Sequence, residues 1–173
     1  MTRSYIVITL LTLTGLSATS AQSDKIKDVK DDLTMRTPSS ADGSLKPITI
    51  HQEIDFTATP QRLYEALLDE KQFTAFSGSR AEINREIGGA FSLFSGHIVG
   101  RNVELIPNQR IVQAWRTADW PEGMYSIVRF EFKAQGSGTH LIFDHVGFPE
   151  GRHDHLAEGW DEHYWEQLKK YLR

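Results

Sequence analysis

Apolar and polar residues alternate at the start of the patterned part of the chain, over residues 48–56. This two-residue period is typical of a half-buried strand. Thr59 and Pro60 follow, and they are the residue types preferred at a helix N-cap and in a first helical turn. Four apolar residues then share one face of the predicted helix: Leu63, Tyr64, Leu67 and Leu68.

A second short helix is predicted directly after the first. Asp69 is a suitable N-cap, and Gln72 stands three residues later, where its side chain can return the capping bond. Phe73 and Phe76 form the apolar side of this helix. The pattern therefore predicts one strand followed by two short helices.

The middle of the chain alternates again, in short runs separated by turn residues. The predicted strands are 81–87, 90–94, 97–106, 110–116, 125–133 and 139–146, and the turns between them include Gly88-Gly89, Ser95-Gly96, Pro107-Asn108 and residues 135–138. Short alternating strands with regular turns indicate an antiparallel meander.

From about Asp154 the apolar period becomes helical. The apolar positions are Leu156, Trp160, Tyr164, Leu168 and Tyr171/Leu172. Gly159 lies inside this helix, where glycine costs about 1 kcal/mol relative to alanine. We expect this glycine to allow a close approach of the helix backbone to the sheet.

The first 46 residues have a different composition. A basic start, an apolar run over residues 5–13 and small residues up to Ala21 match a secretory signal peptide at 1–21. Residues 22–46 are rich in charge and loop chemistry and are predicted to be a flexible leader. The domain is then 47–173, and we expect an exported, periplasmic or extracellular protein without a membrane span in its mature form; an uncleaved anchor or a buried strand is the alternative.

Composition excludes several classes of function. The chain has 173 residues, which indicates one domain, and a net charge of −4, which gives no electrostatic footprint for nucleic acid. Because cysteine is absent, disulfides and thiolate chemistry are excluded.

The chain resembles a known family in several motifs. It is similar to the C-terminal domain of the activator of the heat-shock protein 90 (Hsp90) ATPase, within the START-like (SRPBCC) helix-grip superfamily. The resemblance implies an α+β fold in which a curved antiparallel sheet of six to seven strands wraps around a long C-terminal helix, with two short helices after the first strand. The matching segments are residues 88–94 with Gly96, 105–107, 110–116, 120–123, and Gly159-Trp160 with Tyr164.

This fold usually encloses a cavity between the helix and the concave face of the sheet. Cavities with apolar walls and a few polar groups are the usual form of small-molecule sites. We therefore expect a non-enzymatic domain that binds a small apolar or amphipathic ligand or a peptide there, with no cofactor. The side chains expected to line the cavity are Trp115, Val128, Phe130, Phe132, Leu141, Phe143, His145, Trp160 and Tyr164.

Two other functions stay open. The resemblance implies a protein-interaction domain that stimulates a chaperone ATPase, with Trp120, Pro121 and Glu122 as candidate contacts; the predicted signal peptide instead implies a compartment other than the cytosol, where that chaperone resides. A cyclase or hydrolase is the third possibility, with His145 as general acid or base, although a hydrogen-bonded core histidine fits the same pattern. A monomer or weak dimer is expected.

The acidic and histidine-rich start of the last helix is the remaining candidate site. His155, Glu158 and Glu162 share a helix face at a spacing that suits a divalent metal. Negative residues near a helix N-terminus are also expected from the helix dipole, and no H-E-x-x-H motif occurs. We therefore predict no metal site, and no spacing singles out a catalytic residue.

Overall fold

The computed structural model describes residues 49–173. The predicted signal peptide (1–21) and leader (22–46) lie outside the described residues.

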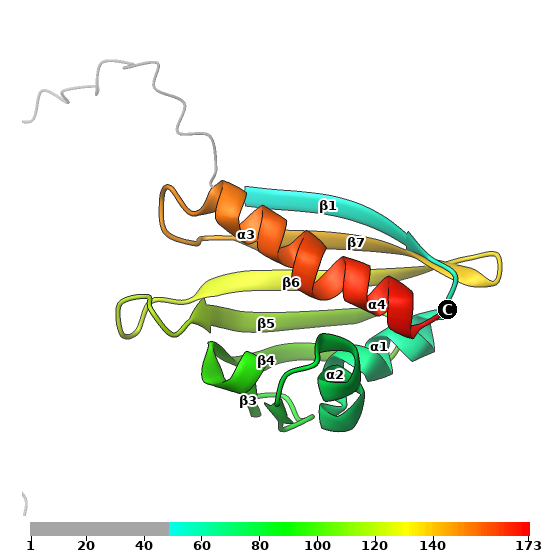
Figure 1. The fold of residues 1–173 in the computed structure, drawn as a ribbon, viewed down its shortest axis with the longest axis horizontal. Coiled ribbons are helices and arrows are strands. Elements are labelled where there is room, and N and C mark those ends of the chain that lie inside the picture. Colours follow the sequence, from blue (N-terminus) through cyan, green and yellow to red (C-terminus); the bar gives the residue numbers. More distant parts are fainter. Residues whose placement is uncertain (1–48) are drawn as a thin grey trace, which may run out of the picture. The chain divides into compact units, whose positions relative to one another are not determined.

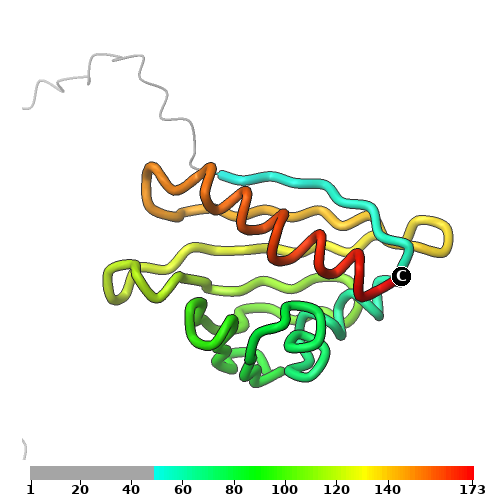
Figure 2. Tube along the Cα trace, viewed as in Figure 1, coloured from blue at the N-terminus to red at the C-terminus, as the bar shows by residue number. Residues whose placement is uncertain are grey.

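Seven strands within this range form one antiparallel sheet in the order β1-β7-β6-β5-β4-β3-β2. Long ladders join the central strands, and the chain runs as a meander from β2 to β7, with β1 returning beside β7 (Figure 2). This is the predicted curved sheet, and its strand count agrees with the prediction. The strands are β1 (Thr49–Phe56), β2 (Glu82–Ile83), β3 (Ala90–Leu93), β4 (Ile98–Ile106), β5 (Arg110–Thr117), β6 (Ser126–Gln135) and β7 (Gly138–Val146).

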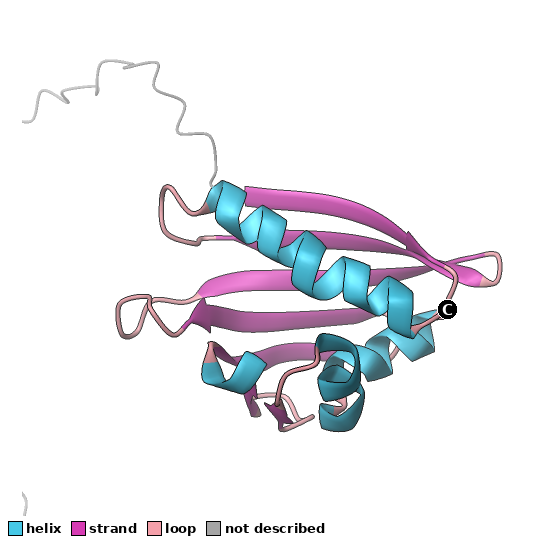
Figure 3. Cartoon of the chain, in the orientation of Figure 1, coloured by secondary structure: helices cyan, strands magenta, loops and turns pink. Residues whose placement is uncertain are grey.

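The helices lie on one face of the sheet. A long C-terminal helix crosses this face diagonally (Figures 1 and 3). It consists of α3 (His153–Trp160), a π-helical turn (Asp161–Trp165) and α4 (Glu166–Tyr171). Helices α1 (Pro60–Leu68) and α2 (Glu70–Ser77) follow β1, and α2 packs against α4. The α+β helix-grip architecture is therefore confirmed.

One residue separates α1 from α2. Thr59 caps α1 as predicted, since its hydroxyl accepts the Arg62 N–H at 3.4 Å. Asp69 caps α2, and its carboxylate accepts the Gln72 N–H at 3.0 Å. The predicted return bond from the Gln72 side chain is not made, because the Asp69 N–H donates to the carbonyl of Glu65 at 2.9 Å. Asp69 thus ends one helix and begins the next.

The hairpin at Gly88-Gly89 is shorter than predicted. The strand expected over 81–87 contains only Glu82 and Ile83, and residues 84–89 form a loop. The Asn84 N–H still donates to the Ala90 carbonyl of β3 at 3.0 Å. Beyond this bond the loop bonds to β4: the Asn102 side chain donates to the carbonyls of Asn84 and Glu86, and its backbone carbonyl accepts from Gly88. The buried amide of Asn102 therefore decides where β2 ends.

The π-helical turn explains how the last helix keeps one apolar face. In a regular α-helix, residues at four-residue intervals are rotated around the helix axis by about 40° per step, so their side chains drift by about 160° between Leu156 and Leu172. A π turn takes in one extra residue and removes about 100° of this drift. Leu156, Leu168 and Leu172 are all buried, and the turn also buries Tyr164 and Trp165 side by side.

The explanation predicted for Gly159 is wrong. A Cβ placed on this residue would meet no atom within 4 Å, so the helix backbone does not approach the sheet closely there. Gly159 instead borders a cavity.

Candidate ligand cavity and interaction surface

A cavity of about 400 Å³ opens beside the C-terminal helix. It lies between α3 with the π turn, the adjacent ends of β4 and β5, and the segment that follows α2. It is lined by Ser77, Ser79, Phe94, His97, Ile98, Trp115, Thr117, His155, Leu156, Gly159, Trp160, His163 and Tyr164. The size is within the range of small-molecule sites, about 300–1,000 Å³.

Two buried polar atoms at this cavity have no hydrogen-bond partner. They are the indole Nε1 of Trp115 and the hydroxyl of Tyr164. Burial raises the pKa of Tyr164 above its ordinary value, and the nearby Trp115 indole offsets part of that rise. The indole N–H and the hydroxyl are therefore neighbours, although no hydrogen bond joins them. Because buried polar groups are nearly always paired, two orphans at one cavity are unusual.

Only three of the residues expected at the cavity border it: Trp115, Trp160 and Tyr164. The other six lie in the packed core under the helix: Val128, Phe130, Phe132, Leu141, Phe143 and His145. Trp160 and Trp165 fill the space above them, with ring centroids 4.4 Å and 5.1 Å from Phe143. The concave face is thus solid at its centre, and the cavity is displaced toward β4.

His145 belongs to a closed hydrogen-bond chain. Its Nδ1 accepts the indole N–H of Trp160 at 3.0 Å, and because an indole can only donate, the proton of His145 is on Nε2. Nε2 then donates to the Ser126 hydroxyl at 2.7 Å, which donates to the carbonyl of Trp115 at 2.9 Å. The residue is fully buried, and burial lowers its pKa to about 3. His145 is a neutral core histidine, hydrogen-bonded to a serine and a tryptophan.

Several cavity residues were not singled out from the sequence. Phe94 and Ser95 have positive φ, 52° and 58°, in the turn before β4, and the ring of Phe94 packs on Tyr164 with centroids 5.4 Å apart. The Ser95-Gly96 turn is the feature of the sequence that indicates this bend.

His155 is the candidate metal ligand that borders the cavity. In the described part of the chain, no group of three or more His, Asp or Glu side chains is arranged to hold a metal ion.

The loop between β5 and β6 has one buried and several exposed residues. Trp120 is buried and packs edge-to-face on Trp115, with centroids 5.7 Å apart. Pro121 and Glu122 are exposed. Trp120 therefore anchors the loop from inside, and its neighbours are left on the surface.

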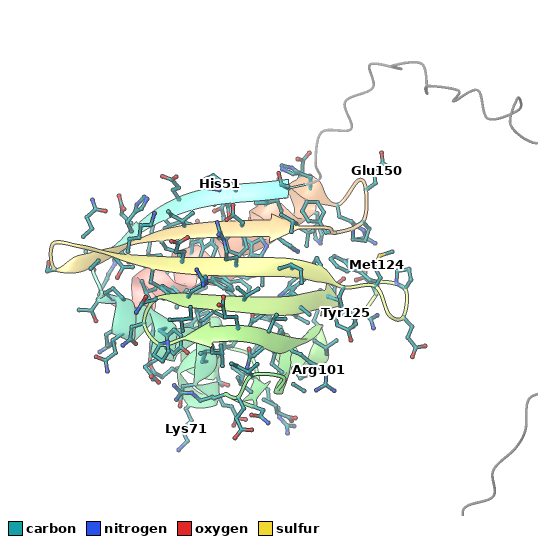
Figure 4. All side chains as sticks on the ribbon, turned by 180° about the vertical axis from the view of Figure 1, so that it is seen from behind. His51, Lys71, Arg101, Met124, Tyr125 and Glu150 are labelled. Atoms are coloured by element: carbon teal, nitrogen blue, oxygen red, sulfur yellow. The ribbon has the colours of Figure 1, made fainter. Side chains whose placement is uncertain are left out.

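Exposed apolar side chains continue from this loop onto the outer face of the sheet. Met124 and Tyr125 are 40% and 47% exposed at the end of the loop (Figure 4), and Ile127 and Val146, opposite each other in the β6–β7 ladder, are 39% and 38% exposed. These four residues are called the β6–β7 patch below. Arg116 lies over the ring of Tyr125, 5.8 Å from its centroid, and adds positive charge at the edge of the patch.

A long helix across a curved antiparallel sheet, with a cavity at one side of the helix, defines the helix-grip class of domain. The family model described as "Activator of Hsp90 ATPase homolog 1-like protein" matches residues 57–173. The chain belongs to this family.

Several curated relatives are named as activators of the Hsp90 ATPase. The chain is 31% identical over 125 residues to "Activator of 90 kDa heat shock protein ATPase homolog 2" of Mus musculus, a match that covers 72% of this chain and 38% of the relative. It is 26% identical over 133 residues to "Hsp90 co-chaperone AHA1" of Saccharomyces cerevisiae, with 73% and 38% covered. The chain therefore spans well under half the length of these relatives.

Solved structures have the same fold. An HSP90 activator from Plasmodium falciparum superposes with a TM-score of 0.69 at 30% identity, covering 72% of this chain and 95% of that one. The Aha1 dimer from Colwellia psychrerythraea superposes with a TM-score of 0.62 at 21% identity, covering 72% and 95%.

The relatives contradict the prediction that the protein is exported to the periplasm or the medium. They are eukaryotic proteins named as activators of the Hsp90 ATPase or as an Hsp90 co-chaperone, and the resemblance places that chaperone in the cytosol. The short apolar run that suggested export is a pattern that a buried strand shares, and it lies outside the described residues. Within residues 49–173, no helix has the length and apolar character needed to cross a bilayer.

Proposed function

We propose that this domain binds a chaperone of the Hsp90 class and stimulates its ATPase. The observation that carries the proposal is the likeness to the HSP90 activator from P. falciparum, 95% of whose chain is matched at 30% identity. Nearly all of that solved chain corresponds to the helix-grip domain described here, and this likeness supports the proposal.

The β6–β7 patch is the contact surface that the structure favours. Apolar residues that cluster on an exposed sheet face are typical of protein interaction sites. The exposed Pro121 and Glu122 of the neighbouring loop extend this surface, while the buried Trp120 fixes the loop's position. The loop predicted from the sequence thus contributes through its exposed residues and through the strand that follows it.

The test is an ATPase assay of a purified Hsp90-class chaperone titrated with the full chain. Ile127→Glu places a charge at the centre of the patch without disturbing the buried face of β6. We expect it to raise the concentration needed for half-maximal stimulation about 30-fold, the effect of losing an interface hot spot. Val103→Glu is the matched control, since Val103 is 49% exposed on β4. A wild-type chain without stimulation, or equal effects of the two variants, would contradict the proposal.

A second function is favoured by the cavity: binding of a small, mainly apolar ligand. The observation that supports this function is a cavity of about 400 Å³ with aromatic walls, bordered by two residues, Trp115 and Tyr164, that each have an unpartnered polar atom. Native mass spectrometry of the full chain purified from its own cells tests it. A stoichiometric small molecule that is absent from a Gly159→Leu variant, whose side chain would project into the cavity, would support the function; an empty wild-type protein would count against it.

The geometry gives no support to an enzyme that uses His145. Both ring nitrogens are engaged, the side chain is fully buried, and the lowered pKa keeps it neutral at physiological pH. A general base needs access to the proton that it takes.

A further inference from the structure

We propose that the cavity takes an uncharged apolar ligand with a carbonyl-type oxygen, which accepts hydrogen bonds from the Trp115 indole and the Tyr164 hydroxyl. This inference rests on the second proposed function and adds the chemical class of the ligand.

Two buried hydrogen-bond donors belong to residues that border the cavity. Trp115 and Tyr164 are 3% and 4% exposed, and neither Nε1 nor the hydroxyl has a partner. An indole N–H only donates, so an acceptor is the one kind of atom that satisfies it. Both residues border the cavity, and a rotation of either ring would be needed to turn its buried polar atom toward a ligand. A carbonyl oxygen has two lone pairs and can accept from both donors at once.

The charge of the lining decides between a neutral and an ionised ligand. Among the described residues that line the cavity there is no Lys, Arg, Asp or Glu. The three lining histidines, His97, His155 and His163, are exposed and therefore lie at the opening. A carboxylate beside the two orphan donors would lose its hydration without a cation to replace it, which is strongly unfavourable. A ketone, ester or amide meets no such penalty.

The side chains in the cavity walls indicate the shape and polarity of the rest of the ligand. Phe94, Trp160 and Leu156 present ring and aliphatic surfaces, and Gly159 leaves one side of the helix without a side chain. Flat apolar bodies suit such walls, because aromatic rings stack or meet edge to face. The structure therefore points to a flat, apolar carbonyl compound.

Three probes with the same ring system test the assignment: 2-acetylnaphthalene, 2-ethylnaphthalene and 2-naphthoate. Their dissociation constants are measured with the full chain by titration calorimetry and by tryptophan fluorescence. We expect the ketone to bind about tenfold more tightly than the hydrocarbon, the gain from one to two hydrogen bonds in a buried site. The carboxylate should bind more weakly than both.

Variants then locate the oxygen. Tyr164→Phe removes one donor with little change in shape and should reduce the preference for the ketone over the hydrocarbon to about threefold. Tyr125→Phe, on the outer face of the sheet, is the matched control and should leave the preference unchanged. Trp115→Phe should reduce the preference for the ketone over the hydrocarbon as Tyr164→Phe does. The change in the affinity for the hydrocarbon measures how far the smaller ring alters the fit between ligand and cavity.

The outcomes separate the ligand class from the existence of a binding site. If ketone and hydrocarbon bind equally, the cavity binds ligands but the carbonyl assignment is overturned, and the indole and the phenol satisfy each other. If the naphthoate binds best, the neutral class is overturned. If no probe binds, both this inference and the cavity function fail.

Discussion

The buried, neutral His145 should make the domain sensitive to mild acid. Its pKa is lowered to about 3 in the folded state, from 6.5 in the unfolded chain. Below pH 6.5 the unfolded chain therefore takes up a proton that the folded domain does not, and stability falls with falling pH until about pH 3. The slope is about 1.4 kcal/mol per pH unit. Between pH 7 and pH 5 this residue alone should lower the free energy of unfolding by about 2 kcal/mol.

Urea unfolding of wild type and His145→Gln at pH 7 and pH 5 isolates this contribution. Glutamine can accept from Trp160 and donate to Ser126, so the variant keeps polar partners while losing the titration. The variant is expected to be less stable at pH 7, but its loss between pH 7 and pH 5 should be smaller than that of wild type by about 2 kcal/mol.

His51, on the surface, serves as a control because its pKa is shifted in the opposite direction. Hydrogen bonds to Asp144 and Glu53 raise the pKa of His51. Its stabilising effect is therefore fully present below pH 6.5 and is lost as the pH rises through the raised pKa. His51→Gln should make the acid loss steeper. Parallel pH dependences of wild type and His145→Gln would refute the reasoning from the buried hydrogen-bond chain.

Three further substitutions test other parts of the structure by thermal or urea unfolding. Gly159→Ala should raise the free energy of unfolding by about 1 kcal/mol, because alanine is the better helix former and its Cβ meets no atom; a loss would mean a contact there. Asp69→Ala should lower the free energy of unfolding by about 1 kcal/mol through loss of the α2 cap, and an unchanged value would show that this cap does not stabilise the domain. Tyr164→Phe should leave it unchanged or slightly higher, since the hydroxyl is unpartnered; a loss above about 1 kcal/mol would reveal a missed hydrogen bond.

Much of the fold could be predicted from the residue pattern. The two-residue period identified the inward faces of the central strands, and Val128, Phe130 and Leu141 are buried as the pattern requires. Thr59 and Asp69 marked the starts of two helices correctly because capping depends on local chemistry. The short β2 could not be predicted, since it depends on hydrogen bonds from Asn102, 18 residues beyond Asn84.

The candidate site was less predictable. A periodic pattern shows which side chains point inward, but it cannot show whether the space they face is filled. Trp165 was not part of the predicted stripe, and the π turn brings it inward to stack on Trp160 with centroids 5.6 Å apart. The two indoles fill the centre of the concave face. The cavity is left where Gly159 and the left-handed turn at Phe94 leave space, and neither feature follows from hydrophobic periodicity.

An ATPase titration of a purified Hsp90-class chaperone shows whether this domain stimulates such a chaperone. The full chain is compared with Ile127→Glu and Val103→Glu at equal concentrations, after circular dichroism has confirmed that all three are folded. We expect saturable stimulation by wild type and Val103→Glu, with a half-maximal concentration about 30-fold higher for Ile127→Glu. A folded wild-type chain that leaves the ATPase rate unchanged at saturating concentration would contradict it.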